Sequence, residues 1–206
     1  MHRRQVYIAG FDVFCVDAES IFANIRLEAA LLGMEALVPT DCDLAIGKDG
    51  EPAEVASKIR DANITLLRSA DALIANLAPF RGLEPDAGTV YEVGFAHALG
   101  LPVVGYGVSR ATYAARVSSA VECTRDKGGC LREAQNHMAV EDFGLPINLM
   151  LACGVYLRGN AVEALQTVAK LLAERAGRPS FGSVAPSRSR HSQASLQAST
   201  LKQPAI

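Results

Sequence analysis

The stretch that decides the fold is SADALIANLAPFRGLEPDAGTVYEVGFAHALGLPVVGY, residues 69–106. It holds two short apolar runs, residues 71–77 and 101–106, on either side of an amphipathic segment, residues 88–100. Short apolar runs are typical of strands that are buried on both faces, and the spacing of the middle segment predicts a helix. This order therefore predicts two parallel strands joined by a crossover helix.

The same alternation continues on both sides of this stretch. Further strands are predicted at residues 5–10, 35–39 and 154–158, and further helices at residues 20–33, 52–70 and 160–176. We expect Ser20 to cap the first of these helices and Gly33 to end it, with Pro52 near the first turn of the second. The pattern predicts a single-domain α/β protein: an open parallel sheet of about five strands with helices on both faces, flavodoxin-like or Rossmann-like.

The composition is typical of one globular domain. The chain has 206 residues, of which 50% are hydrophobic and 20% are charged, and its net charge is −2. These values argue against a nucleic-acid surface, and no apolar run approaches the roughly 20 residues that span a bilayer. The five cysteines form no CxxC pair and the N-terminus lacks a signal-peptide pattern. We therefore expect a reduced, cytoplasmic protein with no nucleic-acid or membrane partner.

Two segments lack the strand–helix alternation. Residues 107–145 mix charge and glycine with few apolar residues, so we expect a functional loop or a flexible flap there. From Gly177 onward the chain is rich in Ser, Gln, Pro and basic residues and contains no acid, which is typical of disorder. We therefore predict a folded domain at residues 1–176 and a disordered basic tail at residues 177–206.

One carboxylate occupies the most apolar part of the helix predicted at residues 88–100. Glu92 has Val90, Tyr91, Val93 and Phe95 as neighbours. An unpaired charge is costly to bury, so Glu92 is either a surface residue or is needed for its chemistry.

Several aspartates follow the predicted strands, where the ligands of open parallel sheets bind. Asp12 follows the first strand, Asp41 and Asp43 follow the second, and Asp86 directly precedes the Glu92 helix. Loop aspartates commonly cap helices and turns, and we favour that role for Asp41 and Asp43. Asp86 together with Glu92 instead suggests chemistry at the anomeric carbon of a sugar, where a carboxylate stabilises or captures an oxocarbenium-like centre.

Other kinds of site have little support in the sequence. The turn GFDVF, residues 10–14, lacks the GxGxxG fingerprint of dinucleotide-binding proteins, and no Walker motif occurs. No His/Cys spacing suggests zinc, and we expect His97 to be a packed or surface histidine. We therefore expect neither a metal nor an organic cofactor.

Four stretches carry a resemblance to a known family: VYIAGFDVF (6–14), SADALIANLAPFRGLEPDAGTVYEVGFAHALG (69–100), LPVVGY (101–106) and DFGLPINLML (142–151). Together they resemble the nucleoside 2-deoxyribosyltransferase family. The second stretch is the most specific, because Asp-x5-Glu entering a helix is characteristic of that family. The resemblance implies that residues 1–176 form the catalytic domain. It also implies that Glu92 is the nucleophile, that Asp86 handles the proton of the base, and that Tyr7 lies beside the nucleophile.

The resemblance also implies a set of substrate-binding residues. Asn148, in LPINLM, corresponds to an asparagine that a neighbouring subunit supplies to the sugar hydroxyls, which implies a homo-oligomer with shared active sites. Some family members have an aspartate in the helix before the third strand, and Asn63 stands at that position here, two residues from Asp61. The residues expected to bind substrate are Asp12, Phe14, Asn63, Gly88 and Asn148.

The activity implied by the resemblance is transfer of 2-deoxyribose between nucleobases by double displacement, through a covalent glycosyl ester of Glu92. The substrates would be purine or pyrimidine deoxynucleosides and free nucleobases, in nucleotide salvage. One alternative is an N-glycosidase that hydrolyses nucleosides or nucleotides. The nucleotide hydrolases of this kind have a Ser/Arg/Gly-rich phosphate loop after the first strand, where Asp12 would repel a phosphate, so the transferase is favoured. A non-catalytic nucleotide-sensing module is a further alternative.

Overall fold

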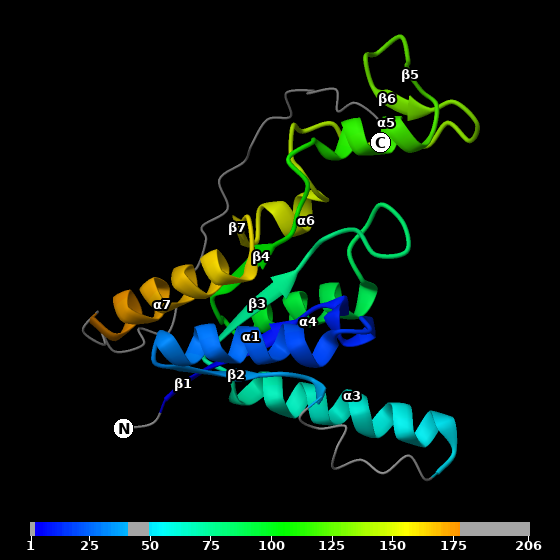
Figure 1. The fold of residues 1–206 in the computed structure, drawn as a ribbon. Coiled ribbons are helices and arrows are strands. Elements are labelled where there is room, and N and C mark those ends of the chain that lie inside the picture. The colour runs from blue at the N-terminus through cyan, green and yellow to red at the C-terminus, as the bar shows by residue number, and fades with distance from the viewer. Residues whose placement is uncertain (1–2, 41–49, 178–206) are drawn as a thin grey trace, which may run out of the picture.

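A five-stranded parallel sheet forms the centre of the computed structural model, which describes residues 3–40 and 50–177 (Figure 1). The strands are β1 (Arg4–Ala9), β2 (Met34–Leu37), β3 (Ala72–Asn76), β4 (Val103–Tyr106) and β7 (Tyr156–Arg158), in the order β2-β1-β3-β4-β7. Every neighbouring pair is parallel; Tyr7 of β1, for example, is in register with Leu37 of β2 and Leu73 of β3. The open α/β sheet expected from the sequence is confirmed.

Helices cover both faces of the sheet, as buried parallel strands require. Helices α1 (Ala18–Leu31) and α7 (Ala161–Gly177) pack on one face, and α3 (Pro52–Ser69) and α4 (Ala87–Ala98) pack on the other (Figure 1). Neighbouring side chains of a strand point to opposite faces. Ile8 of β1 therefore lies in the core shared with α1 and α7, whereas Tyr7 lies in the core shared with α3 and α4.

Local sequence signals explain where several helices begin and end. Pro52 occupies the first turn of α3, where a missing backbone N–H leaves no hydrogen bond unmade. Gly33 and Gly100 follow α1 and α4 with φ of 75° and 72°, a left-handed conformation that glycine adopts without steric cost. The predicted Ser20 cap is wrong: α1 begins at Ala18, and Asp17 occupies the N-cap position without a capping hydrogen bond from its side chain.

Residues 107–145 contain regular elements where the sequence predicted a loop or flap. Helix α5 (Tyr113–Ala120) precedes an antiparallel hairpin of β5 (Cys123–Arg125) and β6 (Leu131–Glu133), and these elements lie together at one end of the molecule (Figure 1). A small separate core joins them, with Ala114, Val117 and Val140 buried. Each element buries too few apolar residues to produce a periodic pattern, so the sequence gives little sign of them.

Several sequence predictions fall at or beyond the limits of the described residues. Helix α7 ends at Gly177, and the predicted tail beyond it lies outside the described residues, as do Asp41 and Asp43. No helix in the described ranges is long and apolar enough to cross a membrane. The four cysteines in those ranges are free thiols. The division of the chain at residue 176 and the cytoplasmic location stay predictions.

Candidate active site

Glu92 and Tyr7 meet on the α4 side of the sheet. Tyr7 lies in the middle of β1 and is fully buried, whereas Glu92 lies in the second turn of α4 and is partly buried. The Tyr7 hydroxyl donates a hydrogen bond of 2.6 Å to Oε1 of Glu92. Among the described residues, no donor reaches Oε2. One carboxylate oxygen is therefore held in place while the other is left available to a ligand.

The surroundings of Glu92 oppose its ionisation. Burial raises the pKa of the Glu92 carboxyl to about 7; the hydrogen bond from Tyr7 opposes this shift, and the negative charge of Asp86 adds to it. A carboxyl group with this pKa exists in both protonation states near neutral pH. A buried carboxylate next to a second acid is a frequent feature of catalytic sites.

Asp86 is fixed at the N-terminus of α4, close enough to Glu92 to influence its charge. It is the N-cap residue, and its Oδ2 accepts hydrogen bonds from the Thr89 amide (2.8 Å) and the Thr89 hydroxyl (3.0 Å). Gly88 follows in the first turn, and a Cβ there would come within 3.1 Å of Oδ2 of Asp86. A side chain at residue 88 would therefore press on the Asp86 carboxylate. The structure thus brings Tyr7, Asp86, Gly88 and Glu92 into one region.

Asp12 lies on the other face of the sheet. Its two carboxylate oxygens accept hydrogen bonds from Nδ2 of Asn76 at 3.0 Å and 3.1 Å, and it borders a cavity of about 240 Å³ between α1 and α7. Burial raises the pKa of the Asp12 carboxyl, and the bond from Asn76 lowers it in part. Because its carboxylate faces away from α4, the structure does not bring Asp12 to Glu92. Contact between Asp12 and a substrate stays a prediction.

Phe14 belongs to an exposed aromatic stack at the edge of the sheet. Its ring and that of Phe11, both in the 3-10 turn η1 (Phe11–Phe14), stack with Phe80, with ring centroids 5.5 Å and 5.1 Å apart. The guanidinium of Arg81 lies 4.6 Å from the Phe80 ring centroid. These residues follow β1 and β3 at their carboxyl ends, which is the edge where open parallel sheets bind ligands. Phe14 is 62% exposed, so its ring is accessible to a planar ligand.

Asn63 has an unusual buried acceptor. It lies on α3 and is half-buried, and its Oδ1 atom is buried without a hydrogen-bond partner in the described part of the chain. A buried acceptor that is left unpaired costs free energy, and a donor from a ligand would remove that cost. Because the atom is closed to solvent in this structure, the substrate contact of Asn63 stays a prediction.

Asn148 is held rigidly at the start of the short helix α6 (Leu149–Ala152). Its Oδ1 accepts a hydrogen bond of 3.0 Å from the Met150 amide, so it caps its own helix. Its Nδ2 donates a hydrogen bond of 2.8 Å to Glu141, and the other oxygen of that carboxylate accepts one from the Leu149 amide at 3.0 Å. The orientation of the Asn148 amide is therefore set from two sides.

Asn148 borders a largely apolar groove of about 840 Å³ between α4 and α6. The α4 residues that line this groove recur with helical spacing along one side of the helix: Ala87, Val90, Val93, Gly94, His97 and Ala98. Glu92 lies on the opposite side of α4. Within one chain, the structure therefore does not bring Asn148 next to Glu92.

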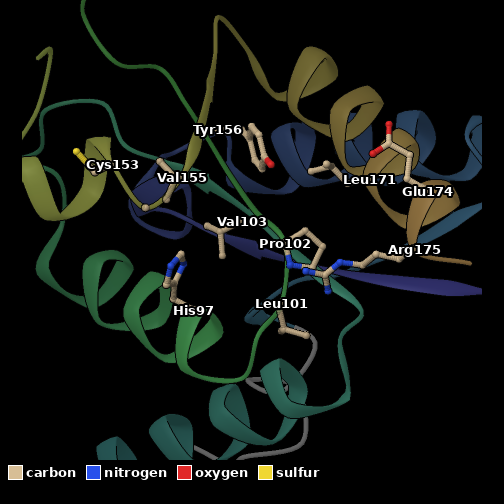
Figure 2. Close-up of a pocket in the computed structure, with 11 residues that line it drawn as sticks. His97, Leu101, Pro102, Val103, Cys153, Val155, Tyr156, Leu171, Glu174 and Arg175 are labelled. Atoms are coloured by element: carbon tan, nitrogen blue, oxygen red, sulfur yellow. The ribbon is translucent and has the colours of Figure 1, made fainter. Parts of the chain in front are cut away.

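A cavity of about 550 Å³ opens at the opposite edge of the sheet, and Figure 2 shows the side chains around it. Val103 begins β4 there and Tyr156 begins β7, while His97 reaches it from α4. It contains none of the residues predicted to bind substrate, and it lies at the amino ends of the strands, where open parallel sheets rarely bind ligands. In the described ranges, no cluster of three or more His, Cys, Asp or Glu residues could hold a metal ion.

The sequence reasoning missed three residues at the carboxyl edge of the sheet: Asn76, Phe80 and Arg81. Phe80 and Arg81 lie in an irregular loop, and their partner Phe14 comes from a different part of the chain, so no local pattern indicates the stack. Asn76 does give a signal. It is a polar residue near the end of the apolar run at residues 71–77, where the carboxyl edge of a parallel sheet begins.

Comparison with known proteins agrees with this geometry. A family model described as nucleoside 2-deoxyribosyltransferase matches residues 6–150. The solved structure of a 2-desoxiribosyltransferase from Leishmania mexicana is similar, with 31% identity and a TM-score of 0.62, over 81% of this chain and 97% of that chain. An uncharacterized protein of Schizosaccharomyces pombe is 28% identical over 187 residues, which cover 82% of this chain and 89% of that protein.

A conserved protein from Enterococcus faecalis V583 shares the fold at 18% identity, with a TM-score of 0.54 over 82% of this chain and 99% of that chain. The family model spans well over half of the 206 residues, and the matched residues include Tyr7 of β1, Asp86 at the N-cap of α4, and Glu92 of α4. On this evidence, the chain belongs to the nucleoside 2-deoxyribosyltransferase family.

Proposed function

We propose that this protein transfers 2-deoxyribose between nucleobases by double displacement, with Glu92 as the nucleophile. The observation that carries the proposal is the 2.6 Å hydrogen bond from Tyr7 to Oε1 of Glu92. It fixes one oxygen of a partly buried carboxylate and leaves the second oxygen available. A carboxylate in this setting can attack the anomeric carbon of a bound sugar and stabilise the positive charge that develops there.

The reaction balances with the side chains of this region alone. Oε2 of Glu92 forms a bond to C1′ as the bond between C1′ and the base breaks, and the electron pair of the broken bond leaves with the base. Asp86, in its acid form, gives a proton to the departing base. In the second half-reaction a free base attacks C1′, gives its proton to Asp86 and releases the Glu92 carboxylate. The cycle therefore needs no cofactor.

The remaining site residues are proposed to bind purine or pyrimidine deoxynucleosides and free nucleobases. The exposed Phe14 ring would stack on the base, and the Asn63 amide would form a hydrogen bond with it. Gly88 would leave room for the sugar beside Asp86. Asp12 would contact the substrate from the edge of the sheet. Such a reaction would serve nucleotide salvage in the cytoplasm.

We also propose that Asn148 acts on the active site of a neighbouring subunit. Two observations support this: Asn148 borders the groove on the side of α4 away from its own Glu92, and the adjacent Met150 is 77% exposed. A two-fold interface would make the exchange reciprocal, with each subunit completing the site of the other.

Mixing two inactive variants tests the shared site. Subunits with Glu92→Ala and subunits with Asn148→Ala should recover activity after exchange, because a mixed dimer contains one site with both native residues. If exchange is verified and no activity returns, Asn148 does not act across an interface.

The activity itself is tested by incubating the protein with a deoxynucleoside, with and without a second free base. A new nucleoside indicates the transferase, free sugar alone indicates the N-glycosidase, and no turnover of any substrate indicates a non-catalytic module. In the absence of an acceptor base, mass spectrometry of the peptide containing Glu92 should show the addition of one deoxyribosyl group. Glu92→Gln is the matched control, because it keeps an acceptor for Tyr7 and removes the nucleophile.

A further inference from the structure

Arg116 is a buried cation in the segment at residues 107–145, where no functional residue is predicted from the sequence. It lies on α5 and is 8% exposed. In the part of the chain that the structure describes, no carboxylate forms an ion pair with it, and its Nε donor has no partner. Burying a guanidinium in this way is costly, and an apolar side chain would avoid the cost. The contacts of Arg116 should therefore explain why it is there.

The two arms of the Arg116 guanidinium bind two different loops. Nη1 donates to the carbonyl oxygen of Leu83, and Nη2 donates to that of Pro146 at 2.8 Å. Leu83 lies three residues before Asp86, and Pro146 lies two residues before Asn148. The planar guanidinium has fixed donor directions, so it sets the distance and the angle between the two carbonyl groups.

Tyr113, one turn earlier on α5, makes a second link between the same loops. Its backbone amide donates to the carbonyl oxygen of Leu145 at 2.7 Å. Its ring lies under the Arg116 guanidinium, 5.6 Å away, and burial together with a hydrogen bond to Glu84 raises the pKa of its hydroxyl to about 12. Helix α5 thus contacts both segments: the Arg116 side chain binds the carbonyls of Leu83 and Pro146, and the Tyr113 backbone amide binds the carbonyl of Leu145.

We propose that Arg116 is a positioning residue that holds the Asp86 loop and the Asn148 segment in one fixed arrangement. The inference rests on the proposed function, in which Asp86 handles the proton of the base in its own subunit and Asn148 binds the sugar in a neighbouring subunit. Catalytic groups must be held to within a fraction of an ångström, and a misplacement of about 1 Å can cost 100-fold in rate. The segment at residues 107–145 then holds two groups in place: Asp86 in the subunit's own active site, and Asn148, which the subunit supplies to the site of its neighbour.

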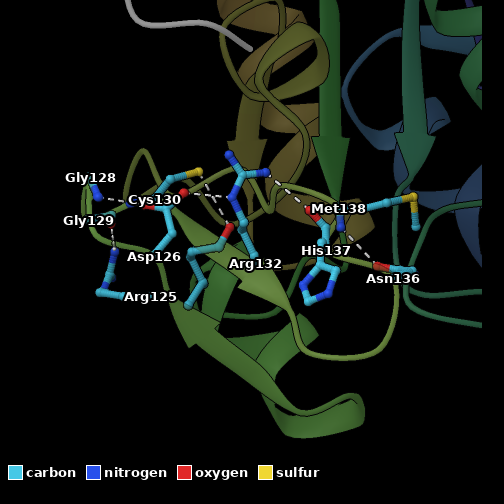
Figure 3. A network of polar contacts seen from close by, with 10 residues as sticks. Arg125, Asp126, Gly128, Gly129, Cys130, Arg132, Asn136, His137 and Met138 are labelled. Atoms are coloured by element: carbon cyan, nitrogen blue, oxygen red, sulfur yellow. Dashed lines mark hydrogen bonds and ion pairs between the residues drawn. The ribbon is translucent and has the colours of Figure 1, made fainter.

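The test compares Arg116→Met and Arg116→Lys with a matched control in the full chain. Arg132→Met is the control. Arg132 lies in the same segment, and its guanidinium binds Asp126, in the turn of the hairpin, and the His137 carbonyl, just after β6 (Figure 3). It binds neither of the two loops. We expect kcat for base release to fall about 100-fold in Arg116→Met. Arg116→Lys should recover part of the loss, because an ammonium group can reach one of the two carbonyls. Arg132→Met should stay within about twofold of the parent protein.

Amide hydrogen exchange gives a readout that does not depend on activity. In Arg116→Met the Thr89 amide, bonded to Asp86, and the Leu149 amide, bonded to Glu141, should both exchange faster, whereas Arg132→Met should leave them unchanged. If the parent protein shows no turnover, the proposed function fails, and exchange alone decides the role of Arg116. If Arg116→Met does not fold, Arg116→Lys is judged by the same two measurements. Unchanged kcat with unchanged exchange, or faster exchange in only one of the two loops, would overturn the proposal.

Discussion

Two carboxylates lie on opposite faces of the same sheet, and each is paired with a polar side chain from a central strand. Glu92 accepts a 2.6 Å hydrogen bond from Tyr7 of β1 on the α4 face, and Asp12 accepts bonds of 3.0 Å and 3.1 Å from Asn76 of β3 on the α1 and α7 face. Burial raises the pKa of both groups. A raised pKa alone therefore does not distinguish a catalytic carboxylate from a structural one.

The two carboxylates differ in what is left unpaired. Both oxygens of Asp12 face one amide group, so its hydrogen bonds are provided from within the fold. Among the described residues only Oε1 of Glu92 is paired, and the neighbouring charge is a second acid, Asp86. An oxygen without a donor next to another carboxylate has no stabilising role in folding. The unpaired oxygen is therefore the better sign of chemistry, and variants of both carboxylates can test this distinction.

The largest effect is expected from Glu92→Ala. Without the nucleophile, base release from a deoxynucleoside should fall by at least about 10⁴-fold, because covalent catalysis is lost altogether. The measurement is kcat under single-turnover conditions, with substrate binding measured separately by calorimetry. Binding should survive, since removing a buried carboxylate relieves its desolvation. A variant that keeps more than a few per cent of the parent rate would show that Glu92 is not the nucleophile.

A smaller loss is expected from Asp86→Asn. Asparagine can still accept the hydrogen bonds of Thr89, so α4 should keep its N-cap, but it cannot exchange a proton. We expect both half-reactions to slow about 100-fold, the usual range for a lost acid–base group. Single-turnover rates of base release and of base capture measure the two half-reactions. If both rates stay within a few-fold of the parent protein, another group transfers the proton.

The pH dependence of the parent protein should follow Glu92. Only the ionised carboxylate can attack, and burial raises the pKa of Glu92 to about 7. The value of kcat/KM should therefore rise through about pH 7 and fall about tenfold for each pH unit below it. The profile of the free enzyme measures this pKa directly. A midpoint near 4.5, the ordinary value for glutamate, would mean that the site is open to solvent.

The same titration of Glu92 should also change the stability of the protein. Activity should rise with pH, whereas the free energy of unfolding should fall. Between about pH 4.5 and pH 7 the unfolded chain has released a proton that folded Glu92 still holds. The free energy of unfolding should therefore fall as pH rises through this window, by on the order of 2 to 3 kcal/mol relative to Glu92→Gln. Denaturant titrations of both proteins across the window measure the difference. If the free energies of unfolding of the two proteins change with pH in the same way, Glu92 does not have a raised pKa in the folded state.

The two faces of the sheet also show what the sequence could predict. Tyr7, Asp86 and Glu92 lie on regular elements whose strand and helix patterns are strong, and the structure brings them together as the family resemblance implied. The face to which Asp12 points was not predictable, because GFDVF forms a 3-10 turn whose direction depends on Asn76, 64 residues away. The hydrogen bonds of Arg116 could not be predicted either. They join two loops that are distant in the sequence, and their acceptors are backbone carbonyls, which every residue has.

The smallest effect on activity is expected at Asp12, where two substitutions separate structure from function. Asp12→Ala should leave Nδ2 of Asn76 buried without an acceptor and lower the free energy of unfolding by about 1 to 3 kcal/mol. Asp12→Asn keeps one acceptor and removes the desolvation of a charge, so its stability should stay within about 1 kcal/mol of the parent protein. Both variants should keep kcat within a few-fold, because the Asp12 carboxylate faces α1 and α7. Denaturant titration and steady-state kinetics measure the two quantities. If Asp12→Asn keeps its stability but loses activity 100-fold, the Asp12 carboxylate is essential to the reaction rather than a contact at the edge of the site, and the contrast with Glu92 fails.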